Sequence, residues 1–267
     1  MPTPDPIRTD ARDGRRRDAD LSSDGHPALQ VVVLAAGMGT RLGRKLPKPL
    51  TQLRDGRSIM QQQLDGVRQA FGPTARVTVV VGYRSKRIMR AQPDLLFAFN
   101  PDFERTNTSK SLWRALRTSP PGGVLWLNGD VVFDAAVLDC TRDLVHADQS
   151  FVCVDTSTVA EEEVKYTLDG DGYIDELSKT VVGGLGEAVG INYVSAADKP
   201  FLIRHLAACA DTDYFERGME TAIQTDGLRF RALDISRFSA VEVDVEDDLH
   251  RANSMLIAAP RRRARVS

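Results

Sequence analysis

An apolar run that ends in a glycine-rich turn is the feature that most constrains how this chain folds. Residues 31–50 read VVVLAAGMGTRLGRKLPKPL, so an apolar stretch is followed by small residues and then by cations. Such a run predicts a buried strand entering a tight turn, where glycine permits backbone angles that other residues avoid. Because Arg41, Arg44, Lys45 and Lys48 lie beside this exposed backbone, the segment indicates a phosphate-binding loop.

Apolar runs alternate with helical patterns through the first half of the chain. Strands are predicted at residues 30–34, 77–81, 124–127 and 151–154. The helical spacing of Met60, Leu64 and Val67 behind Ser58 predicts a helix with Ser58 as its N-cap, and a second helix is expected at 110–117. Strands that are separated by helices favour a mostly parallel sheet covered on both faces.

The second half changes character, because two short runs there flank a turn of aspartates and glycines. Residues 164–168 and 173–177 predict a β-hairpin around 169–172. Further strands are expected at 188–194, 228–235 and 241–243, and helices at 196–209, 214–224 and 246–258. The expected fold is therefore α/β, a Rossmann-like three-layer sandwich whose mostly parallel mixed sheet carries an antiparallel extension.

Composition sets limits on the class of protein. The 267 residues include 35 basic and 37 acidic ones, a balance that argues against a nucleic-acid partner. Three dispersed cysteines predict no disulfide framework, and no window approaches the roughly 20 apolar residues of a membrane span. We expect a disordered leader at 1–27, a single domain at 28–259, a basic tail at 260–267 and a cytoplasmic location.

The sequence of this loop does not match two common nucleotide-binding motifs. The third glycine of G-x-G-x-x-G is replaced by Leu42, and no Lys-Ser or Lys-Thr pair comes directly after a glycine, as a Walker A loop requires. What the chain does contain is L-A-A-G-x-G-T-R followed by P-K-P-L, which resembles the nucleotidyltransferase superfamily that activates sugar phosphates and alcohol phosphates. The alternative interpretation is an ordinary strand-to-helix turn with solvated cations.

The resemblance implies that the loop wraps the triphosphate of an NTP. Arg41 offers a planar fork to phosphate and Lys48 a point charge held between two prolines, so both are expected to act in catalysis. The spacer between these two cations is shorter than in the family pattern. The expected nucleotide-binding residues of the loop are Leu34, Ala35, Ala36, Gly37, Gly39 and Thr40.

Two aspartates are expected to hold Mg²⁺, which prefers hard oxygen ligands. Asp130 ends a strand in the sequence NGD, and Asp244 lies in VEVDVEDDLHRA, which is similar to the family's acidic ending. Asp134 is interpreted as a helix cap. The acids at 246–248 open a helix, where negative charge favours the positive end of the helix dipole, so they are also interpreted as caps.

Other segments resemble the base and acceptor sites of bacterial choline-phosphate cytidylyltransferases. The segment at 100–112 contains polar residues that the resemblance places over the nucleobase, and the end of the strand at 77–81 lies beside it. These residues are Asn107, Ser109, Ser111, Gly82 and Tyr83. On the acceptor side, the resemblance implies that Lys179 contacts the phosphate of the acceptor and that Glu187 faces the part of the acceptor other than the phosphate. Each could instead be a cap, a strand end or a packed residue.

These observations predict a Mg²⁺-dependent nucleotidyltransferase that converts CTP and a small phosphorylated alcohol, with phosphocholine favoured, into a CDP-alcohol and pyrophosphate. Arg41, Lys48 and Lys179 would be its catalytic residues. One alternative is the activation of a sugar 1-phosphate, an inositol phosphate or a phosphonate with CTP, UTP or dTTP. Another is a catalytically silent relative that binds nucleotide as a regulator. The sequence leaves homodimerisation open.

Overall fold

The computed structural model describes residues 28–43, 46–157, 159 and 162–258. Its strands are β1 (Gln30–Ala35), β2 (Arg76–Val81), β3 (Leu96–Phe99), β4 (Val124–Asn128), β5 (Val131–Phe133), β6 (Phe151–Asp155), β7 (Lys165–Leu168), β8 (Ile174–Ser178), β9 (Glu187–Val194), β10 (Arg231–Asp234) and β11 (Ala240–Glu242). Its α-helices are α1 (Ile59–Phe71), α2 (Ser85–Ala91), α3 (Thr108–Leu116), α4 (Ala136–His146), α5 (Lys199–Ala208), α6 (Phe215–Asp226) and α7 (Glu246–Ala258).

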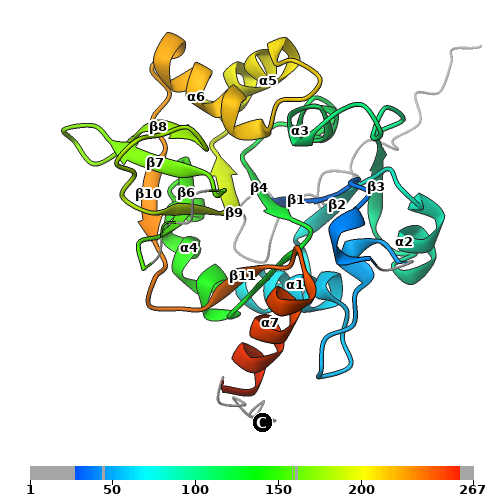
Figure 1. Ribbon diagram of the computed structural model, residues 1–267. Helices are drawn as coiled ribbons and strands as arrows, with labels where there is room; N and C mark the ends of the chain where they lie inside the picture. The colour runs from blue at the N-terminus through cyan, green and yellow to red at the C-terminus, as the bar shows by residue number, and fades with distance from the viewer. Residues whose placement is uncertain (1–27, 44–45, 158, 160–161, 259–267) are drawn as a thin grey trace, which may run out of the picture.

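A mixed sheet runs through the centre of the molecule, as Figure 1 shows. In the described part of the chain, nine strands join it, in the order β10-β6-β9-β4-β1-β2-β3 with the β7–β8 hairpin attached at β9. Strands β4, β1, β2 and β3 are parallel, whereas β9 runs antiparallel to both β4 and β6. The predicted mostly parallel sheet with an antiparallel extension is therefore confirmed.

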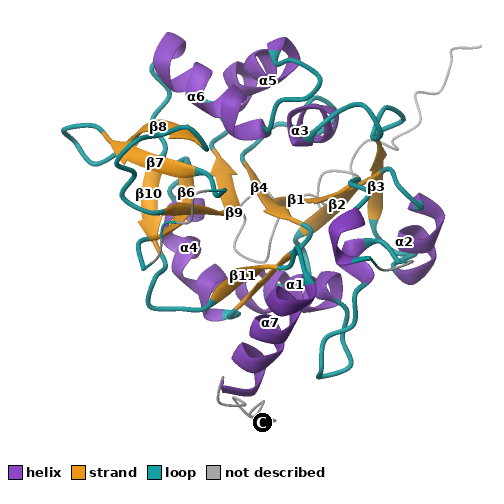
Figure 2. Cartoon of the chain, viewed as in Figure 1, coloured by secondary structure: helices purple, strands orange, loops and turns teal. Residues whose placement is uncertain are grey.

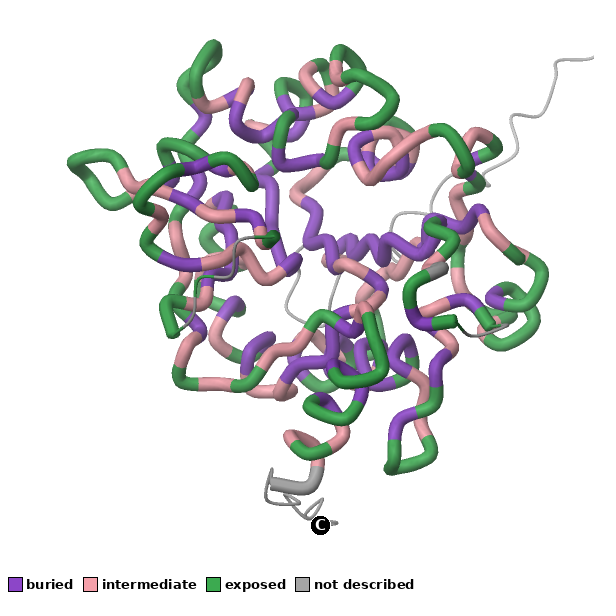
Figure 3. Tube along the Cα trace, in the orientation of Figure 1, coloured by how far each residue is buried: buried purple, intermediate pink, exposed green. Residues whose placement is uncertain are grey.

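Helices cover both faces of the sheet (Figure 2), which explains why its central strands are apolar throughout. All six residues of β1 are buried. In β4 the side chains alternate: Trp126 packs in the hydrophobic cluster of α3, α5 and α6, while Leu125 and Leu127 pack with α1 and α4. Trp126 meets Phe215 of α6 edge-on at 5.6 Å between ring centroids. Figure 3 shows this buried centre between exposed outer loops.

A smaller cluster attaches the end of the chain to the main body. Strands β5 and β11 form a two-stranded antiparallel sheet, and α7 packs beside it through Leu249 and Ala252. Because β5 follows β4 directly and β11 leads into α7, this pairing brings the residues after β11 close to the carboxyl end of β4. The fold thereby unites two acidic segments that are far apart in the sequence.

The predicted elements agree with the structure, apart from short segments whose signals are not local. Ser58 caps α1 by accepting a hydrogen bond from the Gln61 amide at 3.1 Å. Helix α5 begins at Lys199, later than expected, with Pro200 in its first turn. The sequence analysis missed α2, β3 and β5: α2 buries only Ile88 among its residues, and β5 depends on its pairing with distant β11.

Some of the sequence predictions concern residues that the structure does not describe, whereas others can be compared with it. The predicted leader at 1–27, the tail at 260–267 and the cations Arg44 and Lys45 lie outside the residues that the structure describes. The three cysteines are free, as expected. Among the described helices, none has the length and apolar character needed to cross a bilayer.

Gly186 provides a test of the close packing before β9. A Cβ atom there would lie 2.3 Å from the carbonyl oxygen of Asp155, so the Gly186→Ala variant must shift the backbone. We expect a loss of about 1–3 kcal/mol in the free energy of unfolding, measured by urea denaturation. Gly170→Ala is the matched control, because its Cβ meets nothing within 4 Å. Equal stability of the two variants would contradict the packing described here.

Candidate active site

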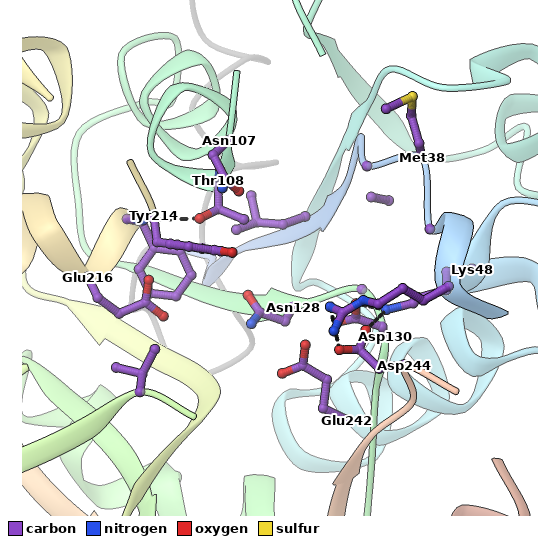
Figure 4. A pocket seen from close by; sticks show the side chains of 18 of the residues that line it. Met38, Lys48, Asn107, Thr108, Asn128, Asp130, Tyr214, Glu216, Glu242 and Asp244 are labelled. Atoms are coloured by element: carbon purple, nitrogen blue, oxygen red, sulfur yellow. Dashed lines mark hydrogen bonds and ion pairs between the residues drawn. The ribbon is translucent and has the colours of Figure 1, made fainter. Parts of the chain in front are cut away.

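A cavity of about 610 Å³ lies where the loops after β1 and β4 meet the first turns of α3 and α6. In open α/β sheets, ligands bind beyond the carboxyl ends of the strands, and this cavity occupies that position. Figure 4 shows its two sides: Lys48, Asp130 and Asp244 lie on one side, and Tyr214 and Glu216 on the other. Asn128 lies between them, and Glu242 lies beside the acidic cluster.

Gly129 permits the close approach that brings the two loops together. Its amide donates a hydrogen bond to the carbonyl oxygen of Leu34 at 2.9 Å. A Cβ atom at Gly129 would lie only 2.5 Å from the same oxygen, so a larger residue would force β1 and β4 apart. Asp130, the next residue, is thereby held beside the glycine-rich loop.

The glycine-rich loop folds back so that Lys48 faces the acids. Gly39 has a φ of +55°, which favours glycine, and Lys48 begins the short 3-10 helix Lys48–Leu50 between Pro47 and Pro49. A Cβ at Gly39 would lie 3.2 Å from Cγ of Lys48, so the loop packs directly against the stem of this lysine. The prolines and this contact restrict the directions in which Lys48 can point.

Two loop cations pair with two aspartates. Lys48 Nζ lies 3.0 Å from Asp130 Oδ2 and also forms an ion pair with Asp244, and the Arg41 guanidinium lies 2.6 Å from the second oxygen of Asp244. Burial alone would lower the pKa of Lys48, but the two aspartates raise it above its ordinary value. The Lys48 side chain is 11% exposed and that of Arg41 is 66% exposed. The ion pairs of Lys48 are therefore better shielded from water than the ion pair of Arg41.

Three carboxylates could hold a divalent ion in this cluster. Asp130, Glu242 and Asp244 each offer an oxygen, and the three oxygens lie within 4.8 Å of one another. This all-oxygen donor set fits a hard cation such as Mg²⁺. Desolvation and the neighbouring charges of Asp130, Glu163 and Asp244 raise the pKa of Glu242 to about 8, an effect that the positive charge of Lys48 opposes only in part.

The sequence analysis included Asp130 and Asp244 but missed Glu242. Residues two apart in an extended segment point to the same side, so Glu242 was detectable from its spacing to Asp244. Among the neighbouring acids, Asp248 and Asp134 act as caps, as expected. Asp248 accepts hydrogen bonds from the Asp244 and Val245 amides at 2.9 and 2.8 Å, and Asp134 accepts one from the Ala136 amide at 2.9 Å.

The predicted nucleotide-binding loop residues largely line the cavity. They are Leu34, Ala35, Gly37, Gly39, Arg41 and Lys48. Ala36 instead accepts a hydrogen bond from the Tyr83 amide at 3.0 Å, and Thr40 begins the 3-10 helix Thr40–Leu42. Gly82 supports the wall: a Cβ there would lie 2.5 Å from Cβ of Phe103, which does line the cavity. Tyr83 packs on the same Phe103 ring.

The polar residues expected over the base divide into two groups. Asn107 lines the cavity and caps α3, since its side-chain oxygen accepts a hydrogen bond from the Thr108 amide at 2.8 Å. Ser109 and Ser111 belong to α3 and are buried, and neither is among the residues that line the cavity. Ser111 accepts a hydrogen bond from the Asn100 side chain at 3.1 Å. Thr108 lines the cavity and was missed.

On the acceptor side, the structure brings Lys179 to the cavity but does not place Glu187 among its lining residues. Lys179 Nζ lies 5.0 Å from the centre of the Tyr214 ring, a cation–π contact. Glu187 instead begins β9, paired in register with Lys165 and Asp155. The role predicted for Lys179 stays a prediction, as do those of the other site residues.

Glu216 is the least expected residue of the cavity. It is only 8% exposed, and its Oε2 has no hydrogen-bond partner within the described residues. Desolvation raises its pKa to about 7, an effect that a hydrogen bond from the Glu216 amide and the positive charge of Lys179 partly oppose. An acid in the first turn of a helix is usually a solvated cap, so no sequence pattern marked Glu216 as buried. A buried carboxylate oxygen without a partner is unfavourable for folding, and such groups are common at functional sites.

Comparison with known proteins identifies the class. A model of the MobA-like NTP transferase domain matches residues 31–177. Because this match spans more than half of the chain, the chain belongs to the MobA-like NTP transferase family, and the predicted resemblance to nucleotidyltransferases is confirmed. The fold and the phosphate-loop motif thus agree with the family assignment.

Particular relatives narrow the comparison. The chain is 28% identical over 257 residues to a CMP-5'-(3-aminopropyl)phosphonate synthase from Streptomyces rubellomurinus, in an alignment covering 89% of this chain and 40% of that relative. The fold of the present chain is similar to that of a CTP:phosphocholine cytidylyltransferase from Streptococcus pneumoniae. The TM-score is 0.70 at 16% identity, and the match covers 86% of this chain and 99% of the other. An inositol-1-phosphate CTP transferase from T. maritima gives a TM-score of 0.69 at 14% identity, covering 87% of this chain and 97% of the other. The chain thus spans about two fifths of the length of the Streptomyces relative, and at these identities the two structures show a shared fold alone.

The buried Glu216 predicts an unusual dependence of stability on pH. Its native pKa of about 7 exceeds the ordinary value of 4.5, so the unfolded chain loses this proton first as the pH rises. Stability is then lost progressively between these two values, by on the order of 3 kcal/mol once both states are ionised. We expect Glu216→Gln to unfold at a higher temperature than the wild type at pH 8, with a smaller difference at pH 5.5.

Glu220→Gln is the matched control on the same helix. Glu220 is also buried, but it accepts hydrogen bonds from Arg217 at 2.9 Å and from the Leu177 amide at 3.3 Å. Removing its charge should lower the melting temperature at both pH values, because these donors lose a charged acceptor. A wild type that is more stable than Glu216→Gln at pH 8 would refute the unpaired state of Glu216.

Proposed function

We propose that this chain is a Mg²⁺-dependent cytidylyltransferase that transfers CMP from CTP to a small phosphonate or phosphate bearing a primary amine. The observation that carries this proposal is the division of one cavity into two ends. One end gathers Lys48 and Arg41 around three carboxylates, and the other presents the buried carboxylate of Glu216 beside Lys179.

The first end suits the transfer of a nucleotidyl group. An acceptor oxygen that is already anionic attacks the α-phosphorus and displaces pyrophosphate, so no general base is needed. Bound Mg²⁺ would neutralise charge on the phosphate oxygens, held by Asp130, Asp244 and Glu242. Arg41 and Lys48 would stabilise the negative charge that develops as the bond to pyrophosphate breaks.

The second end favours a primary amine over a quaternary one. Oε2 of Glu216, which has no partner among the described residues, requires a hydrogen-bond donor, which a primary ammonium supplies and a quaternary ammonium lacks. The Tyr214 ring, which could otherwise face a quaternary ammonium, already carries the ammonium of Lys179 at 5.0 Å. In this arrangement Lys179 would align the acceptor phosphonate while Glu216 holds its amine.

The comparisons support the choice of nucleotide and acceptor. The Streptomyces relative is a synthase of a CMP-linked aminopropylphosphonate, which combines cytidine, a phosphonate and a primary amine. Phosphocholine, which the sequence analysis favoured, is the second candidate because a CTP:phosphocholine cytidylyltransferase shares the fold. Neither acceptor is established for this chain.

A panel of substrates tests this proposal. Pyrophosphate release is measured with each of the four NTPs and with 3-aminopropylphosphonate, propylphosphonate, phosphocholine and glucose 1-phosphate. We expect the highest kcat/KM with CTP and 3-aminopropylphosphonate, roughly tenfold or more above propylphosphonate, which lacks the amine. Equal use of the two phosphonates would contradict the assigned role of Glu216. Tight nucleotide binding without any turnover would instead indicate a regulatory protein.

Glu216→Gln separates recognition of the amine from the chemical step. The variant keeps a hydrogen-bond acceptor but loses the charge, so kcat/KM for 3-aminopropylphosphonate should fall roughly tenfold or more. The value for propylphosphonate should stay near that of the wild type. A parallel decrease for both acceptors would show that Glu216 acts on folding or on general catalysis rather than on the amine.

Lys48→Met tests the opposite end of the cavity. Loss of its charge should lower kcat by roughly 10²-fold or more for every acceptor, because the contact acts mainly in the transition state. The KM for the acceptor should change much less. Turnover near that of the wild type would refute the catalytic role proposed for Lys48.

A further inference from the structure

The loop cations contact the same carboxylates that the proposed function assigns to the metal. Lys48 Nζ reaches both Asp130 and Asp244, and Arg41 takes the remaining oxygen of Asp244. Both side chains come from the loop that is proposed to bind the triphosphate, so each cation has two anionic partners within its reach: the acids and the phosphates. Among the described residues, the ion pairs of Asp130 and Asp244 are those with Lys48 and Arg41.

Competition between these partners follows from charge balance. A divalent ion that approaches Asp130 and Asp244 must either displace Lys48 or accept its repulsion, because the lysine already offsets part of the negative charge of the two aspartates. The Lys48 side chain is 11% exposed, so water screens this repulsion poorly. A triphosphate offers the same lysine and Arg41 a larger negative charge, and drawing them away leaves the carboxylates uncompensated.

We propose that Lys48, assisted by Arg41, keeps the carboxylate site in a low-affinity state for divalent ions until the triphosphate withdraws the two cations. The proposal rests on the proposed function, in that it takes the triphosphate loop and the metal site as one unit. Affinities for metal and nucleotide are then coupled, and by linkage each ligand strengthens the binding of the other. Lys48 thus has a positioning and coupling role in addition to its role in the transition state.

Because of this coupling, the enzyme would bind a divalent ion only weakly when no nucleotide is present. A metal that is bound without nucleotide would have to be rearranged when the triphosphate enters. With Lys48 in place, the ion and the triphosphate arrive together, and the carboxylates become available as the phosphates take their cations. Gly39 packs against the Cβ and Cγ atoms of Lys48, so the exchange would take place by rotation of the terminal part of the side chain, beyond this restricted stem.

The test measures metal binding without turnover. Binding of Mn²⁺ to the full chain is followed by electron paramagnetic resonance, with no nucleotide and then with the non-hydrolysable analogue α,β-methylene-CTP. We expect Lys48→Met to bind Mn²⁺ in the absence of nucleotide roughly tenfold or more tightly than the wild type does. The gain in Mn²⁺ affinity on adding the analogue, corrected for Mn²⁺ bound by free analogue, should shrink in the variant by a similar factor.

Two further variants keep the test decisive. Arg41→Met, at an exposed position, should tighten Mn²⁺ binding in the same direction but by less. Lys179→Met is the control: it removes a positive charge from the same cavity without breaking an ion pair to Asp130 or Asp244, and Mn²⁺ affinity should change by less than about twofold.

The inference would be overturned if the Lys48→Met and Arg41→Met variants bound Mn²⁺ no more tightly than the wild type does. A change of equal size in Lys179→Met would also overturn it, because general charge rather than a specific contact would then explain the effect. The nucleotide-free measurement needs neither CTP nor acceptor. It therefore fails or succeeds independently of the substrates assigned under the proposed function.

Discussion

The structure depends on the close approach of the carboxyl ends of β1 and β4. The hydrogen bond from the Gly129 amide to the Leu34 carbonyl brings Asp130 beside the glycine-rich loop, and the pairing of β5 with β11 brings Asp244 to the same place. Acids from two distant segments then face cations from a third. Their mutual neutralisation stabilises a charged cluster that each segment alone would expose to water.

The two ends of the cavity differ in how their charges are balanced. At the loop end, Lys48 and Arg41 compensate the aspartates, so the cluster is stable and its cations can be exchanged for a metal. At the other end, Oε2 of the buried Glu216 has no hydrogen-bond partner in the part of the chain that the structure describes. Such a residue lowers stability, and we interpret that loss as the consequence of keeping a carboxylate ready for a ligand.

The sequence predicted the architecture wherever the signal was local. The buried strands, the Ser58 cap and the loop motif could each be recognised within a few residues, and Asp130 and Asp244 followed from resemblance. Strand β5 and Glu216 could not be predicted in this way, because a three-residue strand and the burial of a helix-start acid both depend on distant partners. Glu242 was accessible from its spacing, whereas only the structure shows that Ser109 and Ser111 of α3 are buried.

The most direct test of the central claim is a crystal structure of the full chain with Mn²⁺ and α,β-methylene-CTP, in which anomalous scattering locates the ion. The account predicts the ion between Asp130 and Asp244, with Lys48 turned from these acids to the triphosphate. An ion remote from both aspartates, or a Lys48 that still pairs with them while nucleotide is bound, would contradict it.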